Sequence, residues 1–245
     1  MSKTVLTDVR LFAVGADLSG HSNKVELAVE VEDKDATNYR SQGWTEKLGG
    51  LASAEVTGEG QWEADDPGMV DDASWSQLGG TGPWTLGANN AAAVGDLAYL
   101  VKAMRSEYKL GEAVGEVAPW TGTAKSSWPV ARGVFAHPPG TARTATGSGT
   151  GLELGAVASG QRLYAALHVL SAAGATPTLT VTVESSADNT FAAPTTQLTF
   201  AAADEAGGQI LRTGGTAVTD TWWRIAWTIT GTSPSFLFVS SLGIQ

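Results

Sequence analysis

The sequence predicts an all-β fold with one short helix, and three observations lead to this prediction. The 245 residues include 30 glycines spread along the chain, and such spacing favours short strands joined by turns. Several segments alternate apolar and polar side chains with the period of two that a half-buried strand requires. Residues 70–78 are the best candidate for a helix, and it is short.

The strand with the clearest pattern is Val25–Val31, where valine and leucine occupy one face and mostly glutamate the other. Weaker alternation predicts a first strand within residues 4–16 and another over residues 54–62. The helix is expected over residues 70–78, because aspartates would lie in its first turn and a glycine pair would end it.

The central stretch, residues 95–136, is predicted to form strands joined by glycine-containing turns. Small or apolar residues alternate with acidic ones over residues 111–118. In a strand, Glu112 and Glu116 would therefore share one face and Val117 would lie on the other. The expectation is a hairpin with one wet, acidic face and one buried face, and the rest of the chain holding it in place.

Residues 33–60 begin in a charged run and contain few periodic apolar positions, yet they include Tyr39, Trp44 and Leu51. A long irregular segment in a compact domain is usually functional or disordered, and aromatic residues argue against disorder. We interpret the segment as an arm that docks on a neighbouring molecule. A loop folded over its own core is the alternative.

Proline, glycine and small polar residues give residues 138–151 the composition of a linker. The predicted organisation is a first β domain over residues 1–137, this linker, and a second domain over residues 152–245, resembling a β-sandwich or jelly roll. Strands of the second domain are expected at 161–170, 178–184, 195–200, 221–230 and 235–243.

Charge and composition exclude several classes of protein. The net charge of −10 argues against a protein that grips nucleic acid by its phosphates, but not against a surface along which nucleic acid passes. Cysteine is absent, so disulfides and thiolate metal sites are excluded. No apolar run is long enough for a membrane span, and the N-terminus lacks the apolar core of a signal peptide. Folding in a cytoplasm is expected.

Catalytic signals are weak. The histidines His21, His137 and His168 belong to different predicted elements, and no nucleophile elbow or phosphate-binding loop is present. We therefore expect no enzyme activity, no catalytic residue and no cofactor. An acidic cluster could bind a cation, although turn and helix-capping roles explain it more simply: Asp65, Asp66, Asp71 and Asp72.

Tryptophan is abundant, with nine residues, and exposed tryptophans can stack on sugars. Three of them fall in one predicted strand, with Trp223 and Trp227 on one face and Trp222 on the other. Burial in a core or a subunit contact is the favoured interpretation. A carbohydrate-binding module remains an alternative function.

Several motifs follow one another along most of the chain, each of them weak alone. They are the VELAVEV strand at 25–31, SQGW at 41–44, LGGL at 48–51, the strand through 58–60, the small helix, the hairpins of 95–133, TWWRIAW at 221–227 and the ending at 236–244. In this order, they resemble the major tail tube proteins of long-tailed (siphovirus-type) bacteriophages.

This resemblance implies stacked rings, commonly hexameric, whose β-hairpins line a lumen and whose long loops reach the adjacent ring. Residues 111–118 and 128–136 would be the lumen-lining strands, with Glu112 and Glu116 facing the lumen. Residues 33–60 would be the inter-ring arm, with these candidate contact residues: Tyr39, Arg40, Trp44, Lys47 and Leu51. If the second domain duplicates the tube fold, three chains could build a ring.

The same resemblance implies a structural virion protein that self-assembles in the host cytoplasm and forms a conduit for genome passage. DNA would pass without specific binding. The other implied partners are further copies of the chain and tape-measure and tail-terminator proteins, with no membrane. A capsid decoration protein or a carbohydrate-binding β-sandwich is the alternative from a different class, and a hydrolase on a β scaffold is the least favoured.

Overall fold

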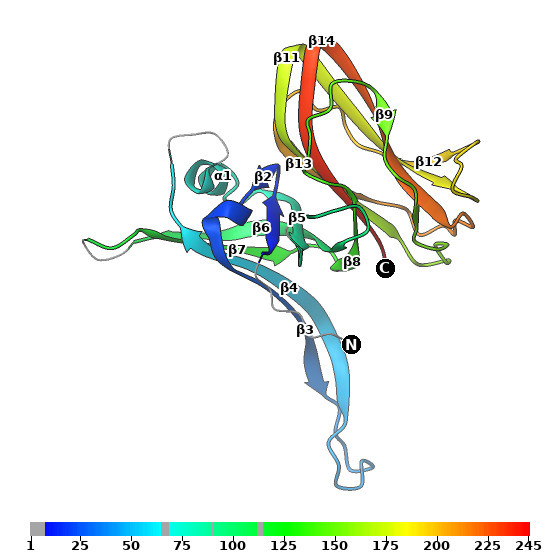
Figure 1. Cartoon of the computed structure of the whole chain (residues 1–245). Helices are drawn as coiled ribbons and strands as arrows, with labels where there is room; N and C mark the ends of the chain where they lie inside the picture. The colour runs from blue at the N-terminus through cyan, green and yellow to red at the C-terminus, as the bar shows by residue number, and fades with distance from the viewer. Residues whose placement is uncertain (1–7, 65–68, 90, 112–114) are drawn as a thin grey trace.

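The structure is a computed structural model, and it describes residues 8–64, 69–89, 91–111 and 115–245. It confirms an all-β fold with one short α-helix (Figure 1). The first part contains β1 (Arg10–Ala13), β2 (Ala16–Asp17), the 3-10 helix η1 (Ser19–His21), β3 (Ser22–Asp35), β4 (Lys47–Gln61), α1 (Val70–Ser76), β5 (Thr81–Gly87), β6 (Leu97–Leu110), β7 (Pro119–Ser126) and β8 (Ala131–His137). The second part contains β9 (Gly147–Ser148), β10 (Leu152–Glu153), β11 (Leu163–Ser186), β12 (Thr195–Thr199), β13 (Gly207–Arg212) and β14 (Trp222–Ile244).

All these strands belong to one 14-stranded hydrogen-bonded network. Its main path runs β12-β11-β14-β8-β6-β5-β1-β2, and a branch leaves β6 through β7 and β4 to β3. The pairing of β14 with β8 joins the two parts of the chain, in a register that places Leu242 opposite Val134. No described helix has the length and apolar character needed to cross a bilayer.

The C-terminal part is built on a ribbon of two very long strands. The 24 residues of β11 and the 23 residues of β14 pair antiparallel along almost their whole length. Register shifts between Val169 and Thr178 interrupt this ladder, and the ribbon bends over at that point (Figure 1). Four of the predicted strands are therefore two continuous ones, because the two strands stay paired on both sides of the register shifts.

Three clusters of buried apolar residues form the core. One lies inside the folded C-terminal ribbon and includes Trp223 and Phe238. A second lies in the first part and includes Trp84 and Trp120. The third includes Phe12 and Tyr164 and joins the two parts.

A fully buried histidine reinforces that junction. Nδ1 of His168 accepts a hydrogen bond from the Gly15 amide at 3.3 Å, and its Nε2 lies 2.9 Å from Oγ1 of Thr85. Since Nδ1 is an acceptor, Nε2 carries the proton and donates to the threonine. Burial lowers the pKa of His168 to about 3, so the neutral ring connects β11 to the strands of the first part.

The residues of the predicted linker lie along β14. The backbone of Arg143 exchanges two hydrogen bonds with Phe236, at 2.7 and 2.9 Å, and the indole Nε1 of Trp227 donates to the Ala145 carbonyl at 3.0 Å. Short β9 continues the contact by pairing with Ala226 and Trp227. The segment is a strap hydrogen-bonded to the C-terminal ribbon, and the division into two domains stays a prediction.

The strand predicted over residues 111–118 is wrong for the residues described there. β6 ends at Leu110, β7 begins at Pro119, and residues 115–118 form the turn between them. Gly111 and Gly115 have φ angles of 153° and 96°, a backbone region that favours glycine and interrupts a strand. Where residues 111–118 are described, the apolar and acidic alternation is therefore not part of a strand, and the predicted site residue Glu112 lies outside the described residues.

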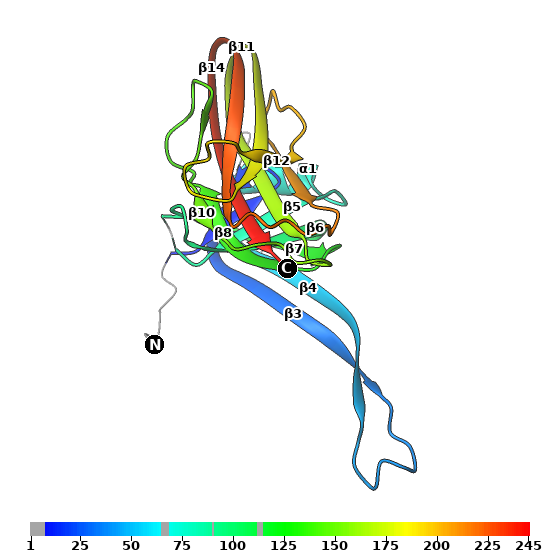
Figure 2. The ribbon, with the colours of Figure 1, turned by 90° about the vertical axis from the view of Figure 1, so that its right-hand side faces the viewer.

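The irregular arm predicted over residues 33–60 is also corrected. β3 and β4 pair from Ser22–Gly60 out to Asp35–Lys47, so only residues 36–46 are irregular. Charged residues are tolerated in these strands because both faces of the outer hairpin meet solvent. Ala54 and Val56 are buried in the body, so the protruding segment is residues 29–53, which we call the arm (Figures 1 and 2).

Candidate functional site

A polar sheet face is the first surface of interest. The strands lie in the order β3-β4-β7-β6, and residues directly opposite each other on paired strands point to the same side. One side of this sheet packs on the core through Val56, Trp120 and Ala124. The other side, which we call the polar face, carries the remaining alternate residues: Lys24, Glu26, Glu30, Glu55, Thr57, Glu59, Met104, Glu107, Lys109, Thr121, Thr123 and Lys125.

The polar face is acidic overall. Lys24 is its best-paired cation, with Nζ 2.7 Å from Glu59 and 3.7 Å from Glu26. The hydrogen bond with Glu59 raises the pKa of this exposed lysine. Glu30 and Glu55 form no ion pair among the described residues. A wet face with surplus carboxylates repels phosphate groups.

Both long edges of this sheet are open in the described part of the chain. β3 pairs with β4 on one side and with no strand on the other. β5 pairs with β6 only as far as Met104, so the outer edge of residues 106–110 has no strand partner there. Open edges of this length are templates for pairing with another chain.

The arm is the second surface of interest. Its tip is an ordered turn in which the amide of Ser41 donates to the Asn38 carbonyl and that of Trp44 to the Ser41 carbonyl, both at 2.9 Å. The side chain of Trp44 is nevertheless 80% exposed and that of Leu51 82%. Six large apolar side chains are exposed on the arm: Val29, Val31, Tyr39, Trp44, Leu48 and Leu51. Contiguous exposed apolar surface is typical of interaction sites, so the arm is a candidate for one.

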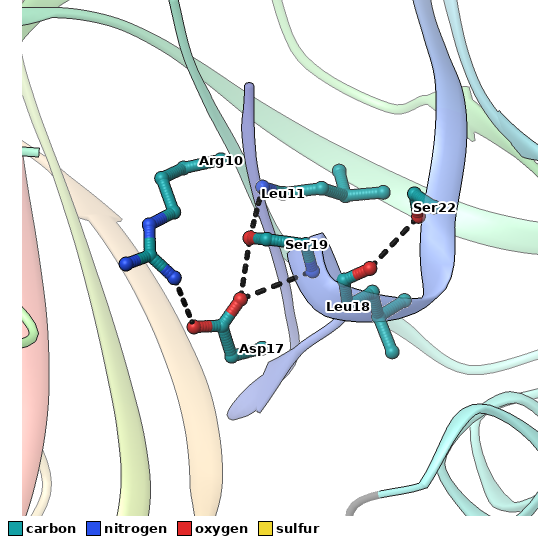
Figure 3. A network of polar contacts seen from close by, with 6 residues as sticks. All are labelled: Arg10, Leu11, Asp17, Leu18, Ser19 and Ser22. Atoms are coloured by element: carbon teal, nitrogen blue, oxygen red, sulfur yellow. Dashed lines mark hydrogen bonds and ion pairs between the residues drawn. The ribbon is translucent and has the colours of Figure 1, made fainter. Parts of the chain in front are cut away.

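A network of polar contacts fixes the start of β3, the strand that runs out into the arm (Figure 3). Arg10 pairs with Asp17 at 2.9 Å, and the Asp17 carboxylate also accepts from the Ser19 amide at 3.1 Å. Oγ of Ser19 then accepts from the Leu11 amide, and Ser22 donates to the Leu18 carbonyl at 2.8 Å. These contacts connect β1 to the first residue of β3.

The predicted arm residues all lie on the arm and are exposed: Tyr39, Arg40, Trp44, Lys47 and Leu51. Lys47 pairs with Asp33 across the hairpin at 3.0 Å. The predicted lumen residue Glu116 lies in the turn between β6 and β7. The predicted lining segment 128–136 leads into β8, where Ala131 and Phe135 are fully buried and Arg132 is exposed. Its role in lining a lumen stays a prediction.

Short helix α1 presents the third surface. Asp71 accepts hydrogen bonds from Trp62 Nε1, at 3.0 Å, and from the Tyr108 hydroxyl. Asp72, Trp75 and Leu78 point outward, and Trp75 is 67% exposed. Of the cluster considered for a cation, Asp65 and Asp66 lie outside the described residues. Among those described, no group of three or more possible ligands is found.

The C-terminal part differs from these surfaces. Every large apolar side chain that is exposed among the described residues lies between Val29 and Val117. Trp223 and Trp227 are buried, and the indole of Trp223 donates to the Gly155 carbonyl at 2.8 Å. These two rings offer no platform for a sugar.

Comparison with known proteins gives partial matches to the fold. No family model matches the chain, and no curated protein sequence matches it. A chain in the virion of a native gene transfer agent particle is 17% identical, covers 53% of this chain and 98% of itself, and has a TM-score of 0.44. A chain of the sheath–tube complex of an extracellular contractile injection system is 14% identical over 54% of this chain and 92% of itself, with a TM-score of 0.42.

The SPP1 Dit protein, described as a paradigm of the hub adsorption apparatus in phages infecting Gram-positive bacteria, covers 97% of this chain and 99% of itself. Its identity is 10% and its TM-score 0.37. All three matches have TM-scores below 0.5. A proposal for the function of this chain is therefore based on its own surfaces.

Proposed function

We propose that this chain is a structural virion protein of a phage tail, whose copies close into rings and stack into a tube for genome passage. The observation that carries the proposal is the polar face with an open strand edge on either side. A sheet with one apolar and one wet face, and with neither edge covered, is suited to closure into a barrel with other copies.

In the proposed ring, the outer edge of β3 of one copy meets residues 106–110 of β6 in the next. Such a head-to-tail contact closes into a ring when its rotation closes. Each copy contributes four strands to the barrel, and the unpaired amides and carbonyls of residues 106–110 and of the facing part of β3 gain partners. Six copies, the common number in the family that the sequence resembles, are proposed.

The polar face then lines the lumen, because the opposite face already packs on the core. Glu30 and Glu55 give the lining its acidity, and a genome would slide past without adhering. This places the lining on the strands themselves and not on the turn that contains Glu116. Tape-measure and tail-terminator proteins are the further partners proposed.

The arm is proposed to reach the adjacent ring, and the C-terminal part to form the outer wall. The distribution of exposed apolar side chains supports this division, since they occur on the arm and the first part of the chain and not beyond Val117. Surfaces that come together in an assembly lose their contact with water, whereas outer surfaces stay in contact with it.

Single cysteines can test the lining, because the native chain contains none. The Glu55→Cys and Asp204→Cys variants place a thiol on the polar face and on the C-terminal surface. While the protein is monomeric, both thiols should react with a small maleimide and with a bulky maleimide that carries about 20 kDa of polyethylene glycol. In tubes, the bulky reagent should label Asp204→Cys fully and Glu55→Cys at least about tenfold more slowly, and the small reagent should label both.

The two reagents separate the possible outcomes. Labelling of Glu55→Cys in tubes by the bulky reagent at the monomer rate would place the polar face outside and contradict the proposal. Failure of the small reagent as well would mean a subunit contact in place of a lumen. A protein that forms no tubes by negative-stain electron microscopy, at any concentration at which it stays soluble, would refute tube formation itself.

Removing the arm tip should abolish stacking without unfolding the protein. The Ala36 amide donates to the Glu46 carbonyl at 2.9 Å, so residues 37–45 can be replaced by an Asn-Gly turn that closes the same two strands. The free energy of unfolding of the variant should lie within about 0.5 kcal/mol of that of the native protein. The variant should form no tubes in electron micrographs. Intact tubes of normal length would contradict a role for the arm in stacking.

A further inference from the structure

We propose that the receptor for the arm is the outer face of α1 in a second copy of this chain, with Arg40 of the arm pairing with Asp72 of the helix. The inference rests on the proposed tube, and it names the two surfaces that meet between rings. The exposed apolar patches of the arm and of α1 would then cover each other.

Most of the basic side chains on the arm are already paired with carboxylates. Three basic residues lie on it, and two of them already have partners: Lys34 pairs with Glu32, and Lys47 pairs with Asp33 at 3.0 Å. Arg40 forms no ion pair within the described ranges. Tyr39 and Trp44, which lie on either side of Arg40 in the sequence, are among the most exposed aromatic side chains of the described residues. The tip therefore combines an unpaired guanidinium with two exposed aromatic rings.

The helix presents the complementary arrangement. Asp71 is engaged by Trp62 and Tyr108, but Asp72 makes no ion pair or side-chain hydrogen bond with any described residue. Trp75 follows three positions later, which places it on the same side of the helix, and the exposed Leu78 extends the patch. Each surface therefore combines one unpaired charge, of opposite sign, with exposed aromatic side chains.

The placement of the two surfaces suits a repeating contact. In both views α1 lies at the end of the first part that is remote from the arm tip (Figures 1 and 2). β3 alone has 14 residues, or about 45 Å at the usual rise per residue. A copy displaced along the arm axis would bring its tip towards the helix of the next copy, and the same contact would then repeat from ring to ring without limit.

The aromatic rings supply the affinity of such a contact, and the charge pair supplies its specificity. Tyrosine, tryptophan and arginine are the residues most enriched at the centres of interfaces. Opposite charges fix register and suppress wrong partners, and like charges placed together are strongly unfavourable. A charge reversal on one surface should therefore prevent stacking, and a matching reversal on the other should restore it.

The experiment compares the full-length chain with Arg40→Glu, Asp72→Arg and the double variant, using sedimentation and negative-stain electron microscopy to measure the concentration at which tubes form. Each single reversal should raise that concentration at least about tenfold. The double variant should return to within about threefold of the native chain. Asp204→Arg, a reversal of the same charge on the C-terminal surface, should leave it unchanged.

The outcomes separate this inference from the proposed function. If the native chain forms tubes but Asp72→Arg assembles normally, or the double variant is no better than either single one, the receptor is not α1 and the tube proposal stands. If the native chain forms no tubes, the proposed function fails. Circular dichroism and urea unfolding check that each variant is folded, and rescue by the double variant would itself exclude a folding defect.

Discussion

Replacing Gly133 with alanine is expected to lower the free energy of unfolding by about 3 kcal/mol, at the upper end of the usual cost of overpacking. Gly133 lies in β8 where this strand pairs with β14, the pairing that joins the two parts of the chain. A Cβ atom there would lie 1.9 Å from the Leu242 carbonyl oxygen and 2.6 Å from the Cα atom of Gly243. Both are backbone atoms, so relief requires the strands to separate.

Gly214→Ala is the matched control, because a Cβ atom there meets nothing within 4 Å. It should change the free energy of unfolding by less than about 0.5 kcal/mol. Urea unfolding of the two variants, followed by circular dichroism, makes the comparison. Equal stability of Gly133→Ala and the native chain would mean that β8 and β14 are not held as closely as described.

Acidification from pH 8 to pH 5 is expected to destabilise the protein by about 4 kcal/mol through two buried histidines, about 2 kcal/mol each. Burial lowers the pKa of His168 to about 3, and burial followed by the charge of Arg143 lowers that of His137 to about 4. In the unfolded chain both titrate near 6.5. Between these values the unfolded state binds more protons, so stability is lost as the pH falls below about 6.5.

The contacts of His137 explain why it resists protonation. Its Nδ1 donates to the Phe238 carbonyl at 3.0 Å, so its Nε2 is the acceptor for the Arg143 Nε hydrogen at 3.1 Å. A second proton on the ring would be carried by Nε2 and would face the guanidinium of Arg143. The ring also stacks on Phe238 with centroids 4.2 Å apart, and this packing excludes water.

The His137→Gln/His168→Gln double variant isolates this effect, since glutamine does not titrate. Urea unfolding at pH 8 and pH 5 gives the loss of stability for each protein. That loss should be smaller in the variant by about 4 kcal/mol, even though the variant is less stable at pH 8. An equal loss in both proteins would assign the acid sensitivity to carboxylates instead.

Local patterns predicted those parts of the fold that depend on neighbours in the sequence. The strand at Val25–Val31 and the helix at Val70–Ser76 are both confirmed, although Val29 and Val31 on the apolar face of the strand are exposed. Continuous β11 and β14 were not predictable, because small residues such as Gly174 and Gly231 look like chain breaks. They instead allow a paired ribbon to bend at positive φ angles, which is a property of the pair of strands and not of either segment.

The lining strand was predicted in a segment that the structure shows to lie between the end of one strand and the start of the next. An acidic, wet strand face was expected at Glu112 and Glu116, where the alternation includes glycines that form a turn. The polar face is instead assembled from four strands, and Glu55 and Lys125 belong to it through their register alone. The exposure of the predicted arm residues could be expected because aromatic side chains stand out in a charged segment, and their contact role stays a prediction. The unpaired states of Arg40 and Asp72 depend on what their neighbours bind, and no sequence pattern contains that information.

The contrast between the arm and the body has a kinetic consequence. The arm is a local hairpin, and such hairpins form within about 10 μs. The body requires partners as distant as Gly15 and His168 to meet, and sheets with pairings of this separation fold in milliseconds to seconds. A newly made chain therefore displays the apolar side chains of the arm well before its body is complete. During that interval collisions between partly folded chains compete with folding, so the yield of assembly-competent protein should fall as the rate of synthesis rises.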